Sequence, residues 1–200
     1  MKIEVFEEPF PYIQIYNFYT DEELELIWKE LNFILNEHNL ASPSETGSAR
    51  KDGVPLKSNQ GIFLDSFYEN RESSNILRLN RKFFEVSEKI FGKCNNWFLK
   101  NFKSNLDWTL ISYYENGDYY HKHTDIAFAT CLTWLYQEPK SFEGGNLLFE
   151  DYDIEIKIKN NSLIFFPSII PHTVTKVSMD EKYIDKLLGR ICISQFICLR

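Results

Sequence analysis

The sequence predicts a mainly β protein, a double-stranded β-helix (a cupin-like jelly roll) braced by N-terminal helices. Short apolar runs bounded by turn residues follow one another after Asn105. Helical patterns, in contrast, are confined to the front of the chain. The length of 200 residues fits one hydrophobic core. We therefore expect a single domain over residues 1–200, with helical support at about 20–92 and the jelly-roll core at about 105–200.

Composition and charge restrict the class of protein. The formal net charge is −7, which argues against a nucleic-acid binder and against a protein that binds an anionic membrane. The sequence contains no apolar run of about 18 residues, so we expect no transmembrane helix. Its first residues do not resemble a signal peptide. The four cysteines match no CxxC metal pattern and are too few for a disulfide scaffold, so we expect a cytoplasmic protein.

The front of the chain predicts one strand and two helices. Residues 12–16 alternate and follow two prolines, which favours a strand. Thr20 and Glu23 form a capping-box pattern, and apolar residues at spacings of three and four follow it. A second helix is expected from Ser74 to Phe91, with Gly92 as its end.

The loop at residues 41–61 has no periodicity and is rich in Gly, Ser and charged residues. A loop of this length inside a compact chain is uncommon and often forms a lid or a binding loop. The other interpretation is a disordered surface insertion, and the sequence favours neither of the two.

The back half of the chain predicts a series of short strands. Residues 153–159 alternate strictly between apolar and charged side chains, so one face should be buried and the other exposed. Asn160 and Asn161 form a tight-turn pair after it. The remaining strands are expected at 108–114, 128–136, 146–149, 163–166, 173–177 and 190–199.

Three of the four histidines fall in this β region, and two of them suit a metal site. His123 and Asp125 flank one residue, so on a strand their side chains share a face. His172 follows behind a second strand. Two imidazoles and one carboxylate can occupy one face of an octahedral metal and leave three positions open, as in the non-heme Fe(II) oxygenases. A bare His-x-Asp is also common as a surface polar pair, so its surroundings decide the interpretation.

Four motifs surround these residues in a fixed order. Residues 114–125 fit Y-x-x-G-x-x-Y-x-x-H-x-D, and residues 143–147 fit E-G-G-x-L. A Phe-Phe-Pro segment at 165–167 precedes His172, and residues 190–194 fit R-x-x-x-S. Together these motifs resemble the 2-oxoglutarate- and Fe(II)-dependent oxygenases, specifically the prolyl 4-hydroxylase-like branch.

The resemblance implies four catalytic residues. His123, Asp125 and His172 correspond to the iron ligands, and Arg190 corresponds to the residue that binds the distal carboxylate of 2-oxoglutarate. A planar guanidinium suits that role because it can bind a carboxylate through two parallel hydrogen bonds.

Three further residues are expected at the 2-oxoglutarate site. Tyr114 corresponds to a tyrosine near the end of 2-oxoglutarate that chelates the iron. Thr133 lies in the strand that often supplies a hydroxyl to the carboxylate bound by Arg190. Ser194 shares strand parity with Arg190, so both should line one wall of the cavity.

Other positions carry weaker expectations. Tyr120 and Thr130 are candidates for the site, and ordinary core packing is an equal interpretation for each. His121 shares parity with His123, but the family pattern does not use it, so we expect it beside the ligands or partly exposed. The segment 178–188 is longer than the usual connection in the family, and we expect a charged surface extension.

The resemblance implies hydroxylation of a substrate C–H bond with release of succinate and CO2. The implied cofactors are Fe(II), 2-oxoglutarate as cosubstrate and O2, with ascorbate as an additional candidate. Loop 41–61 occupies the place where prolyl hydroxylases of this branch fold a mobile loop over a peptide, so a proline-containing peptide or protein is the preferred substrate. Phe196 stands where the nucleic-acid demethylating branch usually has a second arginine, which argues against a nucleic-acid substrate.

Two alternatives remain open at this stage. One is a hydroxylase of a free amino acid or another small molecule, since such enzymes also use lids. The other is a non-catalytic jelly-roll module that binds 2-oxoglutarate, although the intact ligand pattern argues against it. The sequence leaves the oligomeric state open.

Overall fold

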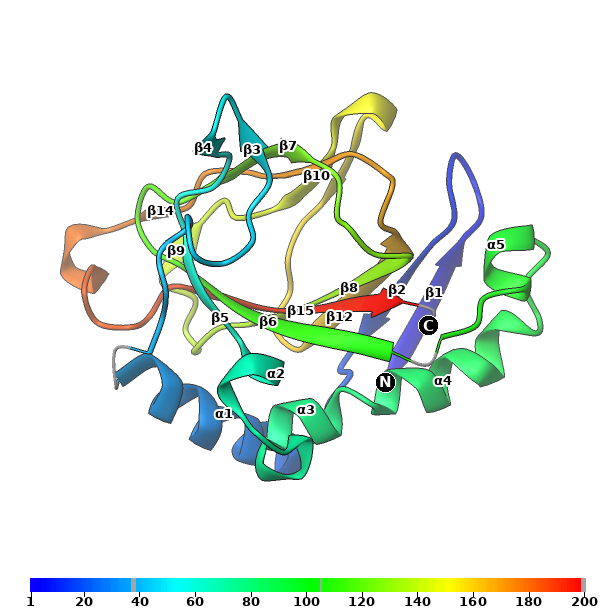
Figure 1. The fold of residues 1–200 in the computed structure, drawn as a ribbon, viewed down its shortest axis with the longest axis horizontal. Helices are drawn as coiled ribbons and strands as arrows, with labels where there is room; N and C mark the ends of the chain where they lie inside the picture. Colours follow the sequence, from blue (N-terminus) through cyan, green and yellow to red (C-terminus); the bar gives the residue numbers. More distant parts are fainter. Residues whose placement is uncertain (37–38, 105, 199–200) are drawn as a thin grey trace.

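The computed structural model describes residues 1–36, 39–104 and 106–198 and contains two facing β-sheets (Figure 1). The larger sheet contains β1 (Lys2–Phe6), β2 (Tyr12–Tyr16), β5 (Gln60–Phe63), β6 (Leu106–Tyr114), β8 (Ala129–Leu135), β12 (Ser162–Pro167) and β15 (Arg190–Cys198). Their spatial order is β1-β2-β12-β8-β15-β6-β5. The smaller sheet has the order β11-β10-β13-β7 and contains β7 (Tyr120–His123), β10 (Leu147–Phe149), β11 (Ile154–Ile156) and β13 (His172–Val174). The expected jelly-roll-like fold is confirmed.

The helices lie along the outer face of the larger sheet (Figure 1). They are α1 (Asp21–Asn36), α2 (Leu64–Phe67), α3 (Asn75–Leu79), α4 (Lys82–Phe91) and α5 (Trp97–Lys100). Two short strand pairs lie outside the main sheets: β3 (Arg50–Lys51) with β4 (Val54–Pro55), and β9 (Phe142–Glu143) with β14 (Ser178–Met179). Within the described residues, no helix is both long and apolar enough to cross a membrane.

The larger sheet separates two apolar cores because successive side chains of a strand point to opposite faces. In β15, Ile191, Ile193 and Ile197 pack into the core under the helices. Cys192 lies in the second core, which fills the space between the two sheets. The alternation expected for this strand is therefore confirmed, and it places Arg190 on the face between the sheets.

Helix α1 begins with the expected capping box. The backbone N–H of Thr20 donates to Oε2 of Glu23 at 2.8 Å, and the N–H of Glu23 donates to Oγ1 of Thr20 at 3.3 Å. Two of the N–H groups that a helix start leaves unpaired are thereby satisfied. The apolar stripe of the helix is buried against the larger sheet.

The prediction of one helix from Ser74 to Phe91 is wrong, because the chain forms α3 and α4 with a break at Asn80. The buried Asn80 side chain accepts a hydrogen bond from the Tyr19 hydroxyl at 2.6 Å and donates to Thr109 at 3.2 Å. These two hydrogen bonds fix the position of Asn80. The chain makes a tighter turn here, in which the N–H of Phe83 donates to the carbonyl of Asn80.

Most of the predicted strands are present within one or two residues of the expected bounds, although Leu199 lies outside the described residues. At 153–159 the predicted alternation is confirmed by buried Ile156 and Ile158, but the hydrogen-bonded strand ends at Ile156. The sequence does not predict strand β1 or the β3–β4 hairpin inside loop 41–61. Segment 178–188 contains β14 and one 3-10 turn, and its charged residues are exposed.

Candidate active site

The structure brings His123, Asp125 and His172 together between the two sheets. Nε2 of His123 lies 3.5 Å from Oδ1 of Asp125, and Nε2 of His172 lies 3.5 Å from Oδ2 of the same carboxylate. The ligand atoms of all three residues lie within 4.8 Å of one another. Both histidines are buried and directly paired across β7 and β13. Two imidazoles and one carboxylate in this arrangement can hold a divalent metal ion.

The two imidazoles are oriented by backbone carbonyls. Nδ1 of His123 lies 2.8 Å from the carbonyl oxygen of His121, and Nδ1 of His172 lies 3.0 Å from that of Ile170. A donor hydrogen on each Nδ1 would leave Nε2 free to bind a metal, which is the usual arrangement for histidine ligands. Burial lowers the pKa of His172, which favours the neutral ring that a metal requires.

Asp125 follows the end of β7 and is held by hydrogen bonds on both its backbone and its side chain. Its N–H donates to the carbonyl of Ser168 at 3.1 Å, and the Thr130 hydroxyl donates to Oδ2 at 2.7 Å. Burial alone would raise the pKa of Asp125, but His172, His123 and the Thr130 hydrogen bond together hold it below its ordinary value. Asp125 is therefore an anion, as a metal ligand has to be.

His121 does not share the face of His123, although the parity of a regular strand would place it there. His172 pairs with His123 and Val174 pairs with Tyr120, so three steps along β7 oppose two steps along β13. The resulting bulge reverses the alternation in β7. Tyr120 consequently stacks on the ring of His123 at a centroid distance of 3.5 Å, while the side chain of His121 is exposed.

Arg190 lies between the sheets with only 1% of its surface exposed. Its guanidinium carbon lies 4.4 Å from the centroid of the Tyr114 ring. Among the described residues, none of its three side-chain nitrogens has a hydrogen-bond partner. A buried charge without a partner costs several kcal/mol, so this site is built for an anion that is not part of the protein.

The two glycines of the E-G-G-x-L motif make room for this region. Gly145 has φ +67°, and a Cβ at this position would lie 2.6 Å from Cδ of Arg190. Gly144 has φ +71°, and its Cβ would lie 2.1 Å from the carbonyl oxygen of Lys176. Both positions therefore require glycine, because of the positive φ and because of the close neighbours.

Ser194 and Tyr114 lie where the sequence places them, and Thr133 does not. Ser194 and Tyr114 line the same small pocket as Arg190 and the two histidines, and we call it the inner pocket. Thr133 pairs with Ile193, which packs under the helices, so Thr133 lies on the opposite face of the sheet. The expectation that Thr133 contacts the 2-oxoglutarate carboxylate is therefore wrong.

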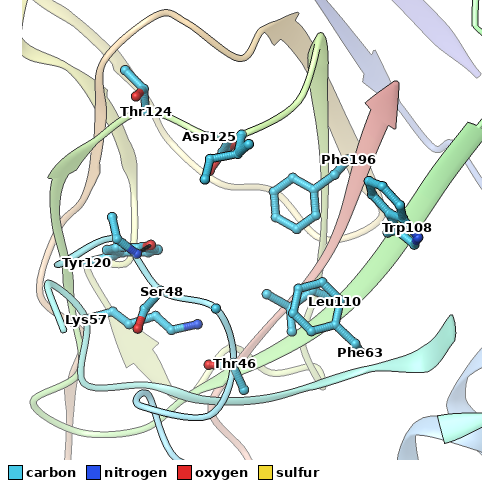
Figure 2. Close-up of a pocket in the computed structure, with 13 residues that line it drawn as sticks. Thr46, Ser48, Lys57, Phe63, Trp108, Leu110, Tyr120, Thr124, Asp125 and Phe196 are labelled. Atoms are coloured by element: carbon cyan, nitrogen blue, oxygen red, sulfur yellow. Dashed lines mark hydrogen bonds between the residues drawn. The ribbon is translucent and has the colours of Figure 1, made fainter. Parts of the chain in front are cut away.

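A second pocket, the outer pocket, adjoins the inner one and has a volume of about 220 Å³. Asp125 and Lys57 line both pockets. Figure 2 shows Phe196, Trp108 and Phe63 along one wall, with Lys57 extending its amine from the opposite side. Residues 46–49 of loop 41–61 also line this pocket, so the loop contributes to the site.

Comparisons with known proteins agree with this geometry. Residues 109–197 match the family model of the 2OG-Fe(II) oxygenase superfamily. A PKHD-type hydroxylase of Parvibaculum lavamentivorans is 33% identical over 81 residues, which are 36% of this chain and 37% of that protein. The matched segment contains His123, Asp125, His172 and Arg190, so the part of the chain that carries the candidate site is similar to the 2OG-Fe(II) oxygenase superfamily.

Solved structures show that the chain has the fold of prolyl hydroxylases. A Pseudomonas putida prolyl-4-hydroxylase has a TM-score of 0.61 at 16% identity, and the match covers 94% of this chain and 92% of the other. A Trichoplax adhaerens prolyl hydroxylase, solved with a peptide fragment of the hypoxia inducible factor oxygen degradation domain, has a TM-score of 0.63 at 13% identity. That match covers 94% of this chain and 83% of the other.

Sequence reasoning misses or underrates three features of this site. Lys57 carries no signal, because it lies in the aperiodic loop and reaches the site only through tertiary contacts. The E-G-G-x-L motif is visible in the sequence, but the contact of Gly145 with Arg190 is not. Thr130 looks equally suited to core packing, although a hydroxyl residue shortly after an Asp at the end of a strand can indicate a carboxylate that needs a hydrogen bond.

Proposed function

We propose that the protein is a 2-oxoglutarate- and Fe(II)-dependent dioxygenase that hydroxylates a proline in a peptide or protein and releases succinate and CO2. The proposal depends mainly on one observation. The buried guanidinium of Arg190, which has no hydrogen-bond partner among the described residues, lines the same inner pocket as His123, Asp125 and His172. A metal site and an anion site in one enclosed space are what a metal-chelating dicarboxylate requires.

The donor set of the triad fits Fe(II). His123 and His172 would supply Nε2 and Asp125 one carboxylate oxygen, which leaves coordination positions for the cosubstrate and dioxygen. Bound Fe(II) would activate dioxygen, which is the oxidant: one oxygen atom would go to the succinate formed from 2-oxoglutarate with loss of CO2, and the other to the substrate C–H bond. The protein holds the two imidazoles in place through the carbonyls of His121 and Ile170, so little rearrangement is needed on binding.

The inner pocket fits 2-oxoglutarate. Arg190 would bind the distal carboxylate through a pair of hydrogen bonds, and Tyr114 and Ser194 would offer hydroxyls along the same wall. Gly145 leaves the guanidinium the space that it occupies. The apolar side chains of Leu132 and other lining residues keep water from the reacting groups.

A peptide substrate is supported by the mouth of the outer pocket. Ile126 and Trp108 line this pocket and are 99% and 43% exposed, so an apolar rim surrounds a cavity with room for a side chain. Exposed apolar groups around a pocket are typical of surfaces that bind another chain. The N–H of Ala49 donates to the Tyr120 hydroxyl at 2.9 Å, so loop 41–61 is tied to the strand that carries His123 and could close over a bound peptide.

Succinate formation tests the proposed chemistry. The purified protein, supplied with Fe(II), ascorbate and 2-oxoglutarate, should produce succinate, and His123→Ala, Asp125→Ala or His172→Ala should abolish it while the circular dichroism spectrum is retained. Arg190→Ala should raise the KM for 2-oxoglutarate. Full succinate production by any triad variant would refute the assigned ligands.

Mass spectrometry tests the proposed substrate. We expect a mass increase of one oxygen on a member of a panel of proline-containing peptides and host proteins, dependent on 2-oxoglutarate and absent with Asp125→Ala. Hydroxylation of free amino acids without hydroxylation of any peptide would refute the peptide substrate and leave the dioxygenase chemistry in place.

A further inference from the structure

Lys57 is a buried cation that the proposed reaction does not yet use. Only 4% of its surface is exposed, and its side chain lines both the inner and the outer pocket. Among the described residues its ammonium has no ion pair or hydrogen bond, and it lies over the face of the Tyr120 ring, 5.6 Å from the ring centroid. A buried ammonium without an anionic partner costs several kcal/mol, so a lysine in this place needs a reason.

The backbone holds Lys57 firmly next to the triad. Lys57 forms an isolated antiparallel bridge with Tyr120. On either side of it, the N–H of Ser58 donates to the carbonyl of Tyr119 at 3.2 Å, and the N–H of His121 donates to the carbonyl of Leu56 at 2.9 Å. The residue is therefore positioned by the same strand that carries His123, and its amine is presented to the pocket by a rigid support.

Apart from Asp125, the walls of the outer pocket offer no anionic partner for this charge. Phe63, Trp108, Leu110 and Phe196 contribute apolar surface. Asp125 is the only acidic side chain that lines the pocket within the described part of the chain, and the proposed function assigns it to the metal. The remaining polar side chains of the lining carry neutral hydroxyls: Thr46, Ser48, Tyr120 and Thr124. An ammonium among neutral and apolar side chains selects a ligand with one anionic group and an apolar body.

We propose that Lys57 binds a carboxylate of the primary substrate, so that the preferred substrate carries a carboxylate close to the carbon that is hydroxylated. This inference rests on the proposed function, since it takes the outer pocket as the substrate site. In a peptide, the carboxylate belongs to an acidic residue or a chain terminus next to the target residue. The amine and the apolar wall then fix opposite ends of that residue beside the metal.

The carboxylate of 2-oxoglutarate is the other possible partner for Lys57, and the structure favours the substrate. Arg190 already offers an unpaired buried cation in the inner pocket, and the triad would hold the other end of 2-oxoglutarate. Lys57, in contrast, is the one cationic side chain among the described residues that line the outer pocket.

Equilibrium binding to the isolated protein distinguishes a substrate carboxylate from that of 2-oxoglutarate as the partner of Lys57, and it does not require turnover. The probes are N-acetyl-L-proline and N-acetyl-L-leucine, each compared with its uncharged amide, and 2-oxoglutarate itself, all measured by calorimetry. Trp108 lines the outer pocket, so its fluorescence gives a second signal for the probes. The variants are Lys57→Met and Lys57→Arg, with Lys51→Met as the control, because Lys51 is an exposed lysine of the same loop.

We expect at least one acid to bind wild type about tenfold more tightly than its amide. Lys57→Met should remove this preference, Lys57→Arg should restore part of it, and Lys51→Met should leave it unchanged. The affinity for 2-oxoglutarate should stay within about twofold of wild type in Lys57→Met.

Two results would overturn the inference. One is wild-type protein that binds every acid and its amide equally well. The other is Lys57→Met protein that loses affinity for 2-oxoglutarate as strongly as Arg190→Met does, because Lys57 would then belong to the cosubstrate. A folded wild-type protein that prefers the acids but forms no succinate would refute the proposed function alone.

Discussion

Replacement of Gly145 by alanine tests whether the E-G-G-x-L motif serves the anion site. The added Cβ would lie 2.6 Å from Cδ and 3.2 Å from Nε of Arg190. Ordinary contact begins at 3.4 Å, so Cδ would have to move by about 0.8 Å. Arg190 is buried and its neighbours are close-packed, so this movement displaces the guanidinium as a whole.

Gly145→Ala should lower the stability of the protein for two reasons and its affinity for 2-oxoglutarate for one. A non-glycine residue at φ +67° costs about 1–2 kcal/mol, and overpacking of a dense interior costs about 1–3 kcal/mol. Loss of one hydrogen bond to a charged group costs about 1.5–3 kcal/mol, which corresponds to a roughly 10- to 140-fold weaker affinity for 2-oxoglutarate.

The assay combines calorimetric binding of 2-oxoglutarate with unfolding by denaturant. Gly53→Ala is the control for backbone strain alone, because Gly53 has φ +81° and a Cβ added there would meet nothing within 4 Å. Gly92→Ala is the control for both effects, since Gly92 has neither a positive φ nor a close neighbour. Both controls should bind 2-oxoglutarate like wild type, and only Gly53→Ala should lose about 1 kcal/mol of stability. A folded Gly145→Ala protein with wild-type affinity would refute the reasoning.

Three other predictions concern single hydrogen-bond networks. Thr130→Val removes the hydroxyl that donates to Asp125 and should weaken binding of Fe(II), measured anaerobically, by about 10-fold or more with little change in fold. Thr20→Ala removes one half of the capping box of α1 and should lower the free energy of unfolding by about 1 kcal/mol in a denaturant titration. Glu30→Ala leaves the buried Ser74 hydroxyl without its acceptor and should lower the free energy of unfolding by about 3 kcal/mol, and a loss below about 0.5 kcal/mol would contradict that assignment.

Strand β15 shows why part of the site is predictable from the sequence. One charged residue, Arg190, begins a run in which three isoleucines, at 191, 193 and 197, share one parity, while Cys192 and Ser194 share the parity of Arg190. Because the period of a strand is two, the position of Arg190 determines which of the following residues share its face. Ser194 lies in the inner pocket for this reason, as the spacing predicts.

Strand β8 shows where the same reasoning fails. All seven of its residues are buried, and threonines occupy both parities at 130 and 133. The sequence of a strand that is buried on both faces does not alternate between apolar and polar residues. The pattern therefore does not indicate which of the two threonines faces the metal site. The hydrogen bond of Thr130 to Asp125 and the pairing of Thr133 with Ile193 decide the question only in three dimensions. The parity that puts His121 on the face of His123 fails for a related reason, since the one extra residue of the bulge in β7 reverses the assignment of faces. The exposure expected for His121 is nevertheless confirmed.

The two halves of the site therefore differ in how the sequence encodes them. The inner pocket is built mainly from residues on hydrogen-bonded strands, where spacing along the chain fixes position in space. The outer pocket is completed by residues 46–49 and Lys57, from a loop without a period whose place depends on contacts such as that between Ala49 and Tyr120. The spacing of residues along the strands is thus sufficient to predict the metal ligands and Arg190, whereas the shape of the proposed substrate pocket depends on the loop. Substitutions at Lys57 should accordingly change which molecule is bound, and substitutions at Arg190 should change whether the cosubstrate is bound.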